Sequence, residues 1–204
     1  MIGIVDYGSG NIQAIKNIYK NLKLDCKFVS SPEDFDGITK IILPGVGAFD
    51  EAMTQLNESG MRAVLDSMVL EEQIPVLGVC VGMQIMAAGS DEGELAGLGW
   101  FDAQVKLFDA STIVHKPKLP HMGWNEISPK SEHPIFTSID LQKGFYFLHS
   151  FYFQCNNTSD VLAETFYGDV FHCAVHKENI YGFQFHPEKS HSNGINLFKN
   201  FAEI

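Results

Sequence analysis

One cysteine of the chain is placed where a nucleophile would be expected. Cys80 lies in the pattern Gly78-x-Cys80-x-Gly82, between a short apolar run and a series of good helix formers. A strand, a sharp turn and a helix in this order form the nucleophile elbow of many hydrolases, here with cysteine in place of serine. The helix N-terminus would favour a thiolate, and the amide of Val81 would face negative charge on a bound carbonyl. An inert buried cysteine at a strand–helix turn is the alternative.

A thiol nucleophile needs a proton acceptor, and one of the eight histidines is suitably placed. His186 follows an apolar, strand-like run, and Glu188 stands two residues further on. In an extended segment these two side chains share a face, so the carboxylate can bond the far ring nitrogen and fix the tautomer. We therefore predict a Cys80–His186–Glu188 triad. A histidine at a strand end beside a solvated glutamate is the alternative.

Apolar strands alternating with helices must position these residues. This alternation of strands and helices predicts an α/β fold with a mainly parallel central sheet flanked by helices. The chemistry of such sheets lies beyond the carboxyl ends of the strands. Gly45–Val46–Gly47 follows the strand Lys40–Leu43 at such an end, and its uncluttered backbone is expected to supply a second oxyanion donor. An ordinary strand-to-helix loop is the alternative. Helices are expected over 61–72 and after Cys80 through Ala88.

The second half of the chain is richer in β-prone residues. An aromatic run over 144–153 and the segments 171–175 and 180–185 are predicted to be strands, followed by a helix over about 193–201. Pro120–Asn125 combines Pro, His, Trp and Asn, which is typical of a recognition loop, with a purely structural role equally open. The length of 204 residues and the absence of a linker predict a single domain, 1–204.

Composition excludes several classes of function. A formal net charge of −11 argues against nucleic-acid or anionic-membrane partners, and no apolar run reaches the length of a membrane span. The four cysteines are far apart without a CxxC pair, so neither a zinc site nor a disulfide framework is indicated. We expect a cytoplasmic protein with reduced thiols and with no metal or other cofactor.

Three motifs together resemble one known family. Gly-x-Cys-x-Gly-Met-Gln, the upstream Pro-Gly-Val-Gly and the C-terminal His-Pro-Glu are similar to those of class I glutamine amidotransferases. Asp6–Asn11 and Pro120–Asn125 resemble the branch formed by glutaminase subunits of imidazole glycerol phosphate synthase. This resemblance implies a flavodoxin-like fold with an added β region and hydrolysis of glutamine to glutamate and ammonia through a Cys80 thioester. It also implies a heterodimer with a (β/α)₈ cyclase subunit that makes imidazole glycerol phosphate and AICAR in histidine biosynthesis.

The resemblance also implies roles for further residues. Val46 and Val81 would supply the oxyanion amides. The glutamine pocket would be lined by Gly47, Gln84, Glu92, His149, Ser150 and Phe151. The face toward the partner would carry Trp124, Tyr146 and Lys189.

Other functions remain open at this level. Residues 97–104 depart from the family's pattern, which keeps open a paralogous subunit that supplies ammonia for the amidination of surface sugars. A γ-glutamyl hydrolase or cysteine peptidase would use the same triad on a longer substrate. A binding module without catalysis is a third alternative, which an intact triad disfavours.

Overall fold

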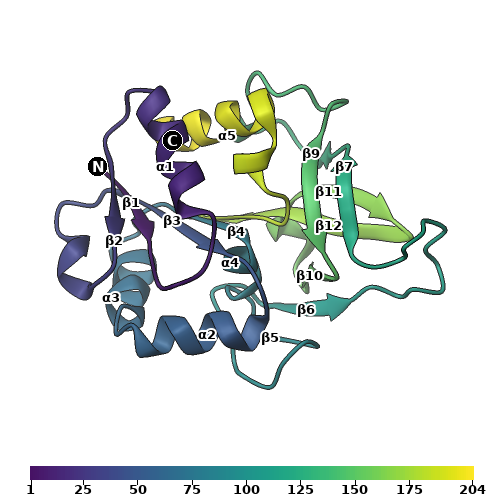
Figure 1. The fold of residues 1–204 in the computed structure, drawn as a ribbon, viewed down its shortest axis with the longest axis horizontal. Helices are drawn as coiled ribbons and strands as arrows, with labels where there is room; N and C mark the ends of the chain where they lie inside the picture. Colours follow the sequence, from purple (N-terminus) through teal and green to yellow (C-terminus); the bar gives the residue numbers. More distant parts are fainter.

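The computed structural model describes residues 1–204, and a parallel sheet forms its centre (Figure 1). Five parallel strands lie in the order β2-β1-β3-β4-β13. Their bounds are Ile2–Val5 for β1, Cys26–Val29 for β2, Lys40–Gly45 for β3, Val76–Cys80 for β4 and Ile180–Phe183 for β13. All residues of β1, β4 and β13 are buried, as expected for strands covered on both faces. The predicted α/β fold is confirmed.

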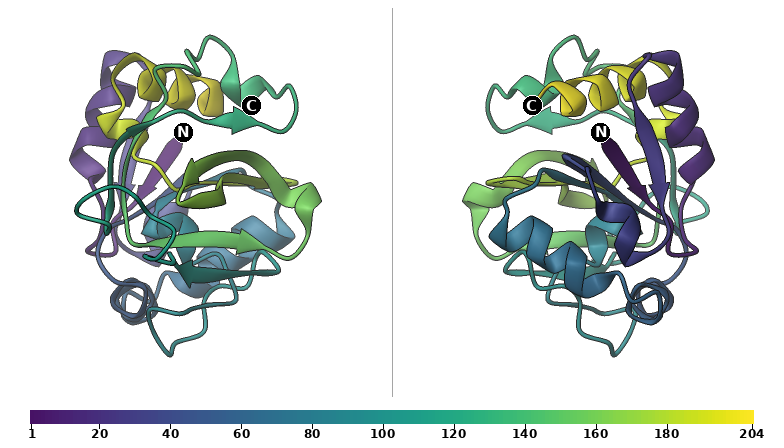
Figure 2. Two further views of the ribbon diagram at one scale, coloured as in Figure 1. Left: turned by 90° about the vertical axis from the view of Figure 1, so that its right-hand side faces the viewer. Right: turned by 90° about the vertical axis from the view of Figure 1, so that its left-hand side faces the viewer.

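Helices cover both faces of this parallel sheet. Helices α1 (Ile12–Asn21) and α5 (His191–Glu203) lie together on one face, and α2 (Phe49–Glu58) and α3 (Arg62–Asp66) lie on the other (Figures 1 and 2). The helix expected over 61–72 is divided, because α3 is followed by a π-helical segment, Ser67–Glu71. Short 3₁₀ turns at Pro32–Phe35, Pro134–Phe136 and Thr158–Asp160 join other elements.

A mainly antiparallel region extends the sheet beyond β13, in agreement with the added β region, and only β5 and β6 pair in parallel. The order continues through β12, β10, β6 and β5, with β11 and β8 paired beyond β12. The bounds are Gly89–Ser90 for β5, Ala103–Leu107 for β6, Ser128–Pro129 for β8, Phe151–Cys155 for β10, Val161–Tyr167 for β11 and Asp169–Lys177 for β12. Strand β11 was not predicted from the sequence, and its long hairpin with β12 places both strands in the same sheet as β4.

A separate two-stranded sheet lies beside this region. Strands β7 (His121–Asn125) and β9 (Phe145–His149) pair in antiparallel fashion, with Trp124 opposite Tyr146. The loop expected at Pro120–Asn125 is therefore wrong as secondary structure, because five of these six residues form strand β7. The aromatic run 144–153 likewise contains two strands, β9 and β10, which belong to different sheets and separate at Ser150.

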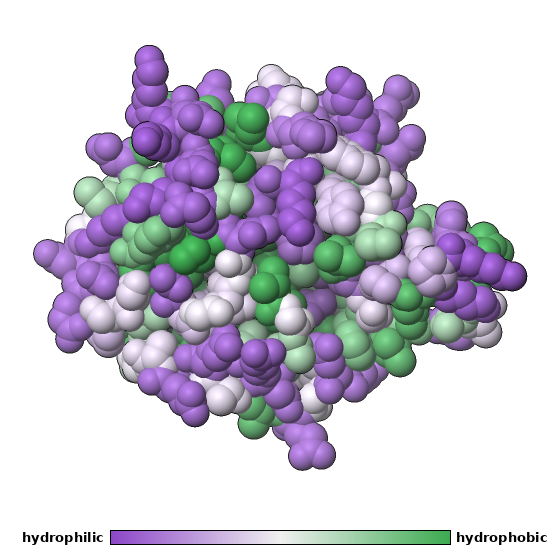
Figure 3. Space-filling view, viewed as in Figure 1, coloured by the Kyte–Doolittle hydropathy of each residue, from purple (hydrophilic) through white to green (hydrophobic).

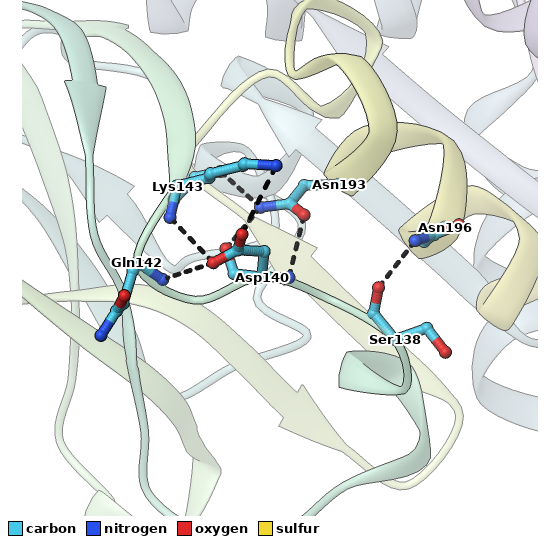
Figure 4. Close-up of polar contacts among 7 residues, drawn as sticks. Ser138, Asp140, Gln142, Lys143, Asn193 and Asn196 are labelled. Atoms are coloured by element: carbon cyan, nitrogen blue, oxygen red, sulfur yellow. Dashed lines mark hydrogen bonds and ion pairs between the residues drawn. The ribbon is translucent and has the colours of Figure 1, made fainter.

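Polar contacts fasten the segment before β9 to the start of α5 (Figure 4). The Asn193 side chain accepts from the amide of Asp140 and donates to the carbonyls of Asp140 and Gly144, at 2.8–3.0 Å. One turn later on α5, Asn196 donates to the carbonyl of Ser138 at 2.7 Å. Since α5 begins shortly after His186, these bonds fix β9 relative to the predicted catalytic histidine.

The sheet and its covering helices enclose one hydrophobic core of 56 buried residues. Hydrophilic side chains cover most of the face seen in Figure 3, and apolar ones reach the surface near its centre and toward the side occupied by the antiparallel strands. None of the helices is long and apolar enough to cross a membrane. No group of three or more His, Cys, Asp or Glu side chains is arranged to hold a metal ion.

Candidate active site

Cys80 occupies a strained turn between β4 and helix α4 (Val81–Gln84). Its φ of 54° and ψ of −112° place a non-glycine residue in a conformation that L-amino acids rarely adopt. The elbow packs directly on β3, where Gly45 pairs with Cys80. A Cβ on Gly82 would overlap the carbonyl oxygen of Leu43, so this close approach requires glycine. The strand–turn–nucleophile geometry expected from the sequence is present.

The helix that follows Cys80 is shorter than expected. Helix α4 is only four residues long and ends at Gln84, and tighter turns carry the chain to β5. The predicted continuation to Ala88 is wrong, because residues 86 and 87 bond three positions back and the chain must turn to reach Gly89. A four-residue helix has a small dipole. Stabilisation of a Cys80 thiolate must therefore come mainly from neighbouring side chains.

His186 follows β13 and is held against β9 by its backbone. Its amide donates to the carbonyl of Tyr146 at 2.8 Å, and its carbonyl accepts from the hydroxyl of Ser190 at 2.7 Å. The ring Nδ1 lies 2.9 Å from Glu188 Oε1, and the two side chains are 3% and 1% exposed. The extended geometry expected for this pair is wrong, since Pro187–Lys189 forms a 3₁₀ turn that folds the carboxylate back toward the ring.

The electrostatics of this group favour a charged imidazole. Burial by itself would lower the pKa of His186, but interactions with Cys80 and Glu188 raise it to about 10. A protonated ring between a buried carboxylate and a thiol stabilises the thiolate as an ion pair. Glu188 Oε1 also accepts from Asn11 Nδ2 at 3.3 Å, whereas Oε2 has no partner within the protein.

A cavity of about 290 Å³ opens in front of Cys80 and His186. All six residues expected to bind glutamine line it: Gly47, Gln84, Glu92, His149, Ser150 and Phe151. Burial lowers the pKa of His149 to about 3, so its ring is neutral near pH 7. The carboxylate of Glu92 accepts from the amide of Phe49 at 2.9 Å, which fixes this otherwise exposed side chain at the start of α2.

The two expected oxyanion donors differ in their surroundings. Val81 opens α4, whose first N–H groups have no partners within the helix. The N–H of Val46 donates to Ser9 Oγ at 2.8 Å, and the Ser9 hydroxyl lies 2.8 Å from the Val46 carbonyl oxygen. This contact between Ser9 and Val46 was not predicted from the sequence. Because of it, Val46 can serve an oxyanion only after leaving Ser9, and its role stays a prediction.

The three residues expected at a partner face lie close together, beside the cavity. Trp124 is 47% exposed and stacks on His191 with ring centroids 5.3 Å apart. Tyr146 is its cross-strand neighbour, and Lys189 Nζ lies 5.8 Å from the centre of the Tyr146 ring. Lys189 also lines the cavity, so this surface continues into the site.

Some residues of the site were not predicted from the sequence. Pro120 and Leu148 line the cavity, and Asn11 contacts the triad carboxylate across 177 positions. Gln184 is fully buried with its Nε2 at 3.8 Å from Cys80 Sγ. The Gly10–Asn11 turn and the polar residue within the apolar run 180–185 were the features that could have drawn attention to them.

Comparison with known proteins gives a consistent picture. The family model of class I glutamine amidotransferases matches residues 3–204. A Bdellovibrio bacteriovorus protein named imidazole glycerol phosphate synthase subunit HisH is 52% identical over the full length of both chains. A Leptospira borgpetersenii protein of the same name is 47% identical, again over both full lengths. A solved structure titled as a glutamine amidotransferase superposes with a TM-score of 0.73 at 20% identity, covering 99% of this chain and 97% of its own, which supports the fold.

Proposed function

Because this chain belongs to the class I glutamine amidotransferase family, we propose that it is the glutaminase subunit of an imidazole glycerol phosphate synthase in histidine biosynthesis. It is an enzyme that hydrolyses glutamine to glutamate and ammonia. The observation that carries this proposal is the buried pair His186 and Glu188 beside Cys80, with Cys80 and His186 at the wall of a small cavity. Full-length identity of 47–52% to subunits with that name supports the pathway.

Acylation begins with the thiolate of Cys80. Its sulfur attacks the side-chain amide carbon of glutamine, and the carbonyl oxygen takes up negative charge near the amide of Val81. His186, held protonated by Glu188, gives its proton to the departing nitrogen as the C–N bond breaks. Ammonia leaves, and a glutamyl thioester remains on Cys80.

Deacylation returns the enzyme to its starting state. Water attacks the thioester carbon while the now neutral His186 accepts a proton from it. The C–S bond breaks, glutamate leaves, and Cys80 departs as a thiolate beside a protonated His186. Glu188 keeps the ring in one tautomer through both halves of the reaction.

The cavity favours a small substrate. Its volume of about 290 Å³ is at the lower limit of small-molecule pockets, which begin at roughly 300 Å³. We propose that Gly47, Gln84, Glu92, His149, Ser150 and Phe151 contact glutamine there. A cysteine peptidase would need a longer cleft. The departure at residues 97–104 lies outside the cavity, with Trp100 and Phe101 buried in the core, so it leaves the glutaminase chemistry unaffected.

A subunit of this synthase requires a cyclase partner, because ammonia released into water would be protonated and diluted. We propose a (β/α)₈ cyclase that docks over Trp124, Tyr146 and Lys189 to form a cytoplasmic heterodimer. The exposed Trp124 would be its aromatic anchor. The continuous sheet and the single core support one domain over residues 1–204.

The test is glutamate release by the purified chain, alone and with the cyclase partner and its acceptor. The complex should form imidazole glycerol phosphate from glutamine, and Cys80→Ser should abolish this use of glutamine while added ammonium salts still support the cyclase. An electrophilic diazo-ketone analogue of glutamine should label Cys80. Labelling of another cysteine at a comparable rate, or peptide cleavage without glutamate release, would contradict the proposal. Ammonia transfer only to a sugar acceptor would assign the chain to the paralogous function.

A further inference from the structure

Gln184 is a fully buried polar residue next to the nucleophile, and the mechanism above gives it no role. It directly follows β13, two residues before His186, and its side chain is 0% exposed. Its Nε2 lies 3.8 Å from Cys80 Sγ, and its Oε1 lies 3.1 Å from Gln84 Nε2. The amide therefore bridges the reacting sulfur and a residue of the cavity wall.

The hydrogen-bond network fixes which end of the Gln184 amide faces the sulfur. Gln84 Nε2 donates to the carbonyl of Phe151 at 3.0 Å and to Gln184 Oε1. A carbonyl can only accept, so the nitrogen of Gln84 must occupy this position and its two N–H groups are both used. Gln184 must consequently present Oε1 to Gln84 and its N–H groups to Cys80.

The sulfur of Cys80 is the hydrogen-bond partner of a Gln184 side-chain N–H group. No other acceptor contacts Gln184 Nε2, and a buried donor without a partner is costly. A neutral thiol is a weak acceptor, whereas a thiolate is a strong one. The arrangement therefore matches the charged form of Cys80 better than the neutral form.

We propose that Gln184 is a catalytic residue that donates an N–H···S hydrogen bond to the Cys80 thiolate, with Gln84 as the residue that orients it. This inference rests on the proposed function, since it assumes that Cys80 is the nucleophile. The bond favours the attacking thiolate before acylation and the departing thiolate when the thioester is hydrolysed. His186 loses and regains a proton during each turnover, whereas the Gln184 amide can donate a hydrogen bond at every step.

The decisive experiment measures the reactivity of Cys80 without using glutamine. Gln184→Met keeps the length of the side chain and removes the donor. Iodoacetamide should then alkylate Cys80 about tenfold more slowly at pH 7, the lower end of what a hydrogen bond to a charged group provides. Site-resolved mass spectrometry follows each thiol, and Cys26, which is half-buried, serves as an internal control with an unchanged rate.

A matched variant controls for the loss of a buried amide as such. Asn200 is 8% exposed and donates to the backbone carbonyls of Ile135 and Thr137, and none of these residues lines the cavity. Asn200→Leu should lower the melting temperature but leave the alkylation rate of Cys80 unchanged. In glutaminase assays, Gln184→Met should lower kcat with little change in KM, because Gln184 does not line the cavity.

Two further measurements keep the proposal testable if Gln184→Met does not fold. Gln184→Glu retains the shape but places an acceptor against the thiolate, so it should slow alkylation at least as much. In the unsubstituted protein, the side-chain amide proton resonance of Gln184 should move upfield when Cys80 is alkylated, while that of the exposed Gln13 stays in place. An unmoved resonance, or a folded variant with unchanged alkylation, would overturn the proposal. Failure of unsubstituted Cys80 to react with the diazo-ketone analogue would instead overturn the proposed function.

Discussion

Replacing Glu188 by glutamine isolates the contribution of one negative charge to the triad. The carboxylate is 1% exposed, and its Oε1 accepts from His186 Nδ1 at 2.9 Å and from Asn11 Nδ2 at 3.3 Å. Its Oε2 has no protein partner. In Glu188→Gln the carbonyl oxygen can keep both bonds while the amide nitrogen takes the position of Oε2, so the ring can retain its productive tautomer. The charge is then the main loss.

The size of the effect follows from the difference between two kinds of hydrogen bond. A hydrogen bond to a charged group contributes about 1.5–3 kcal/mol and a neutral one about 0.5–1.5 kcal/mol. The difference of about 1–2 kcal/mol corresponds to a reduction in kcat of roughly five- to thirtyfold. This loss is smaller than that expected for Cys80→Ser, which removes the thiolate. The pKa of His186 should also fall below its value of about 10, because one of the two groups that raise it has become neutral.

Glutamate release measured across pH, together with NMR titration of His186, tests this reasoning. Glu203→Gln is the matched control, since that carboxylate is 63% exposed and forms an ion pair only at 3.8 Å. Asn11→Ala should reduce kcat less than Glu188→Gln does, because it removes a bond to the carboxylate and leaves the charge. If Glu188→Gln and Glu203→Gln had equal activity, the triad would be a Cys–His dyad. Activity as low as that of Cys80→Ser would show instead that the tautomer is lost.

Three other perturbations test the elbow, the partner surface and the titration of the site. In Gly82→Ala the new Cβ would overlap a carbonyl oxygen of β3, so the free energy of unfolding should fall by about 1–3 kcal/mol through overpacking, and the melting temperature should fall with it. Gly89→Ala is the control, because its Cβ would meet only the flexible Gln104 side chain at 3.3 Å. In titrations with the cyclase, Trp124→Ala should weaken the stimulation of the glutaminase activity and leave the basal rate nearly unchanged. Equal stimulation of the variant and the unsubstituted protein would show that Trp124 does not lie in the contact. The pKa of His186 is raised from 6.5 to about 10, so its contribution to stability is complete below pH 6.5 and is lost as the pH rises to 10. Chemical unfolding at several pH values should therefore show a decline over this range that is smaller in Glu188→Gln.

The sequence alone determined the features that depend on short-range chemistry. The glycines around Cys80 identified a turn too tight for side chains, and the close approach of Gly82 to β3 gives the reason. Alternating apolar strands and helices identified the parallel half of the sheet, because burial on both faces leaves a continuous apolar run. His186 and Glu188 are two residues apart, so a local pattern was sufficient to pair them even though the predicted backbone conformation was wrong.

Only the tertiary structure decided the features that join distant segments. The residues of β7 were predicted to form a recognition loop, and their pairing with β9 comes from contacts across twenty or more positions. In the sequence, Gln184 is one polar residue in an apolar, strand-like run. Its proposed role becomes visible only in the fold, which packs Gln84 and Cys80, about a hundred positions away, against it. The Val46 amide resembles a free donor in the sequence, but the fold places Ser9 beside it. Local patterns specify which backbone a segment prefers, whereas the partner of each buried polar group is chosen by the packing of the whole chain.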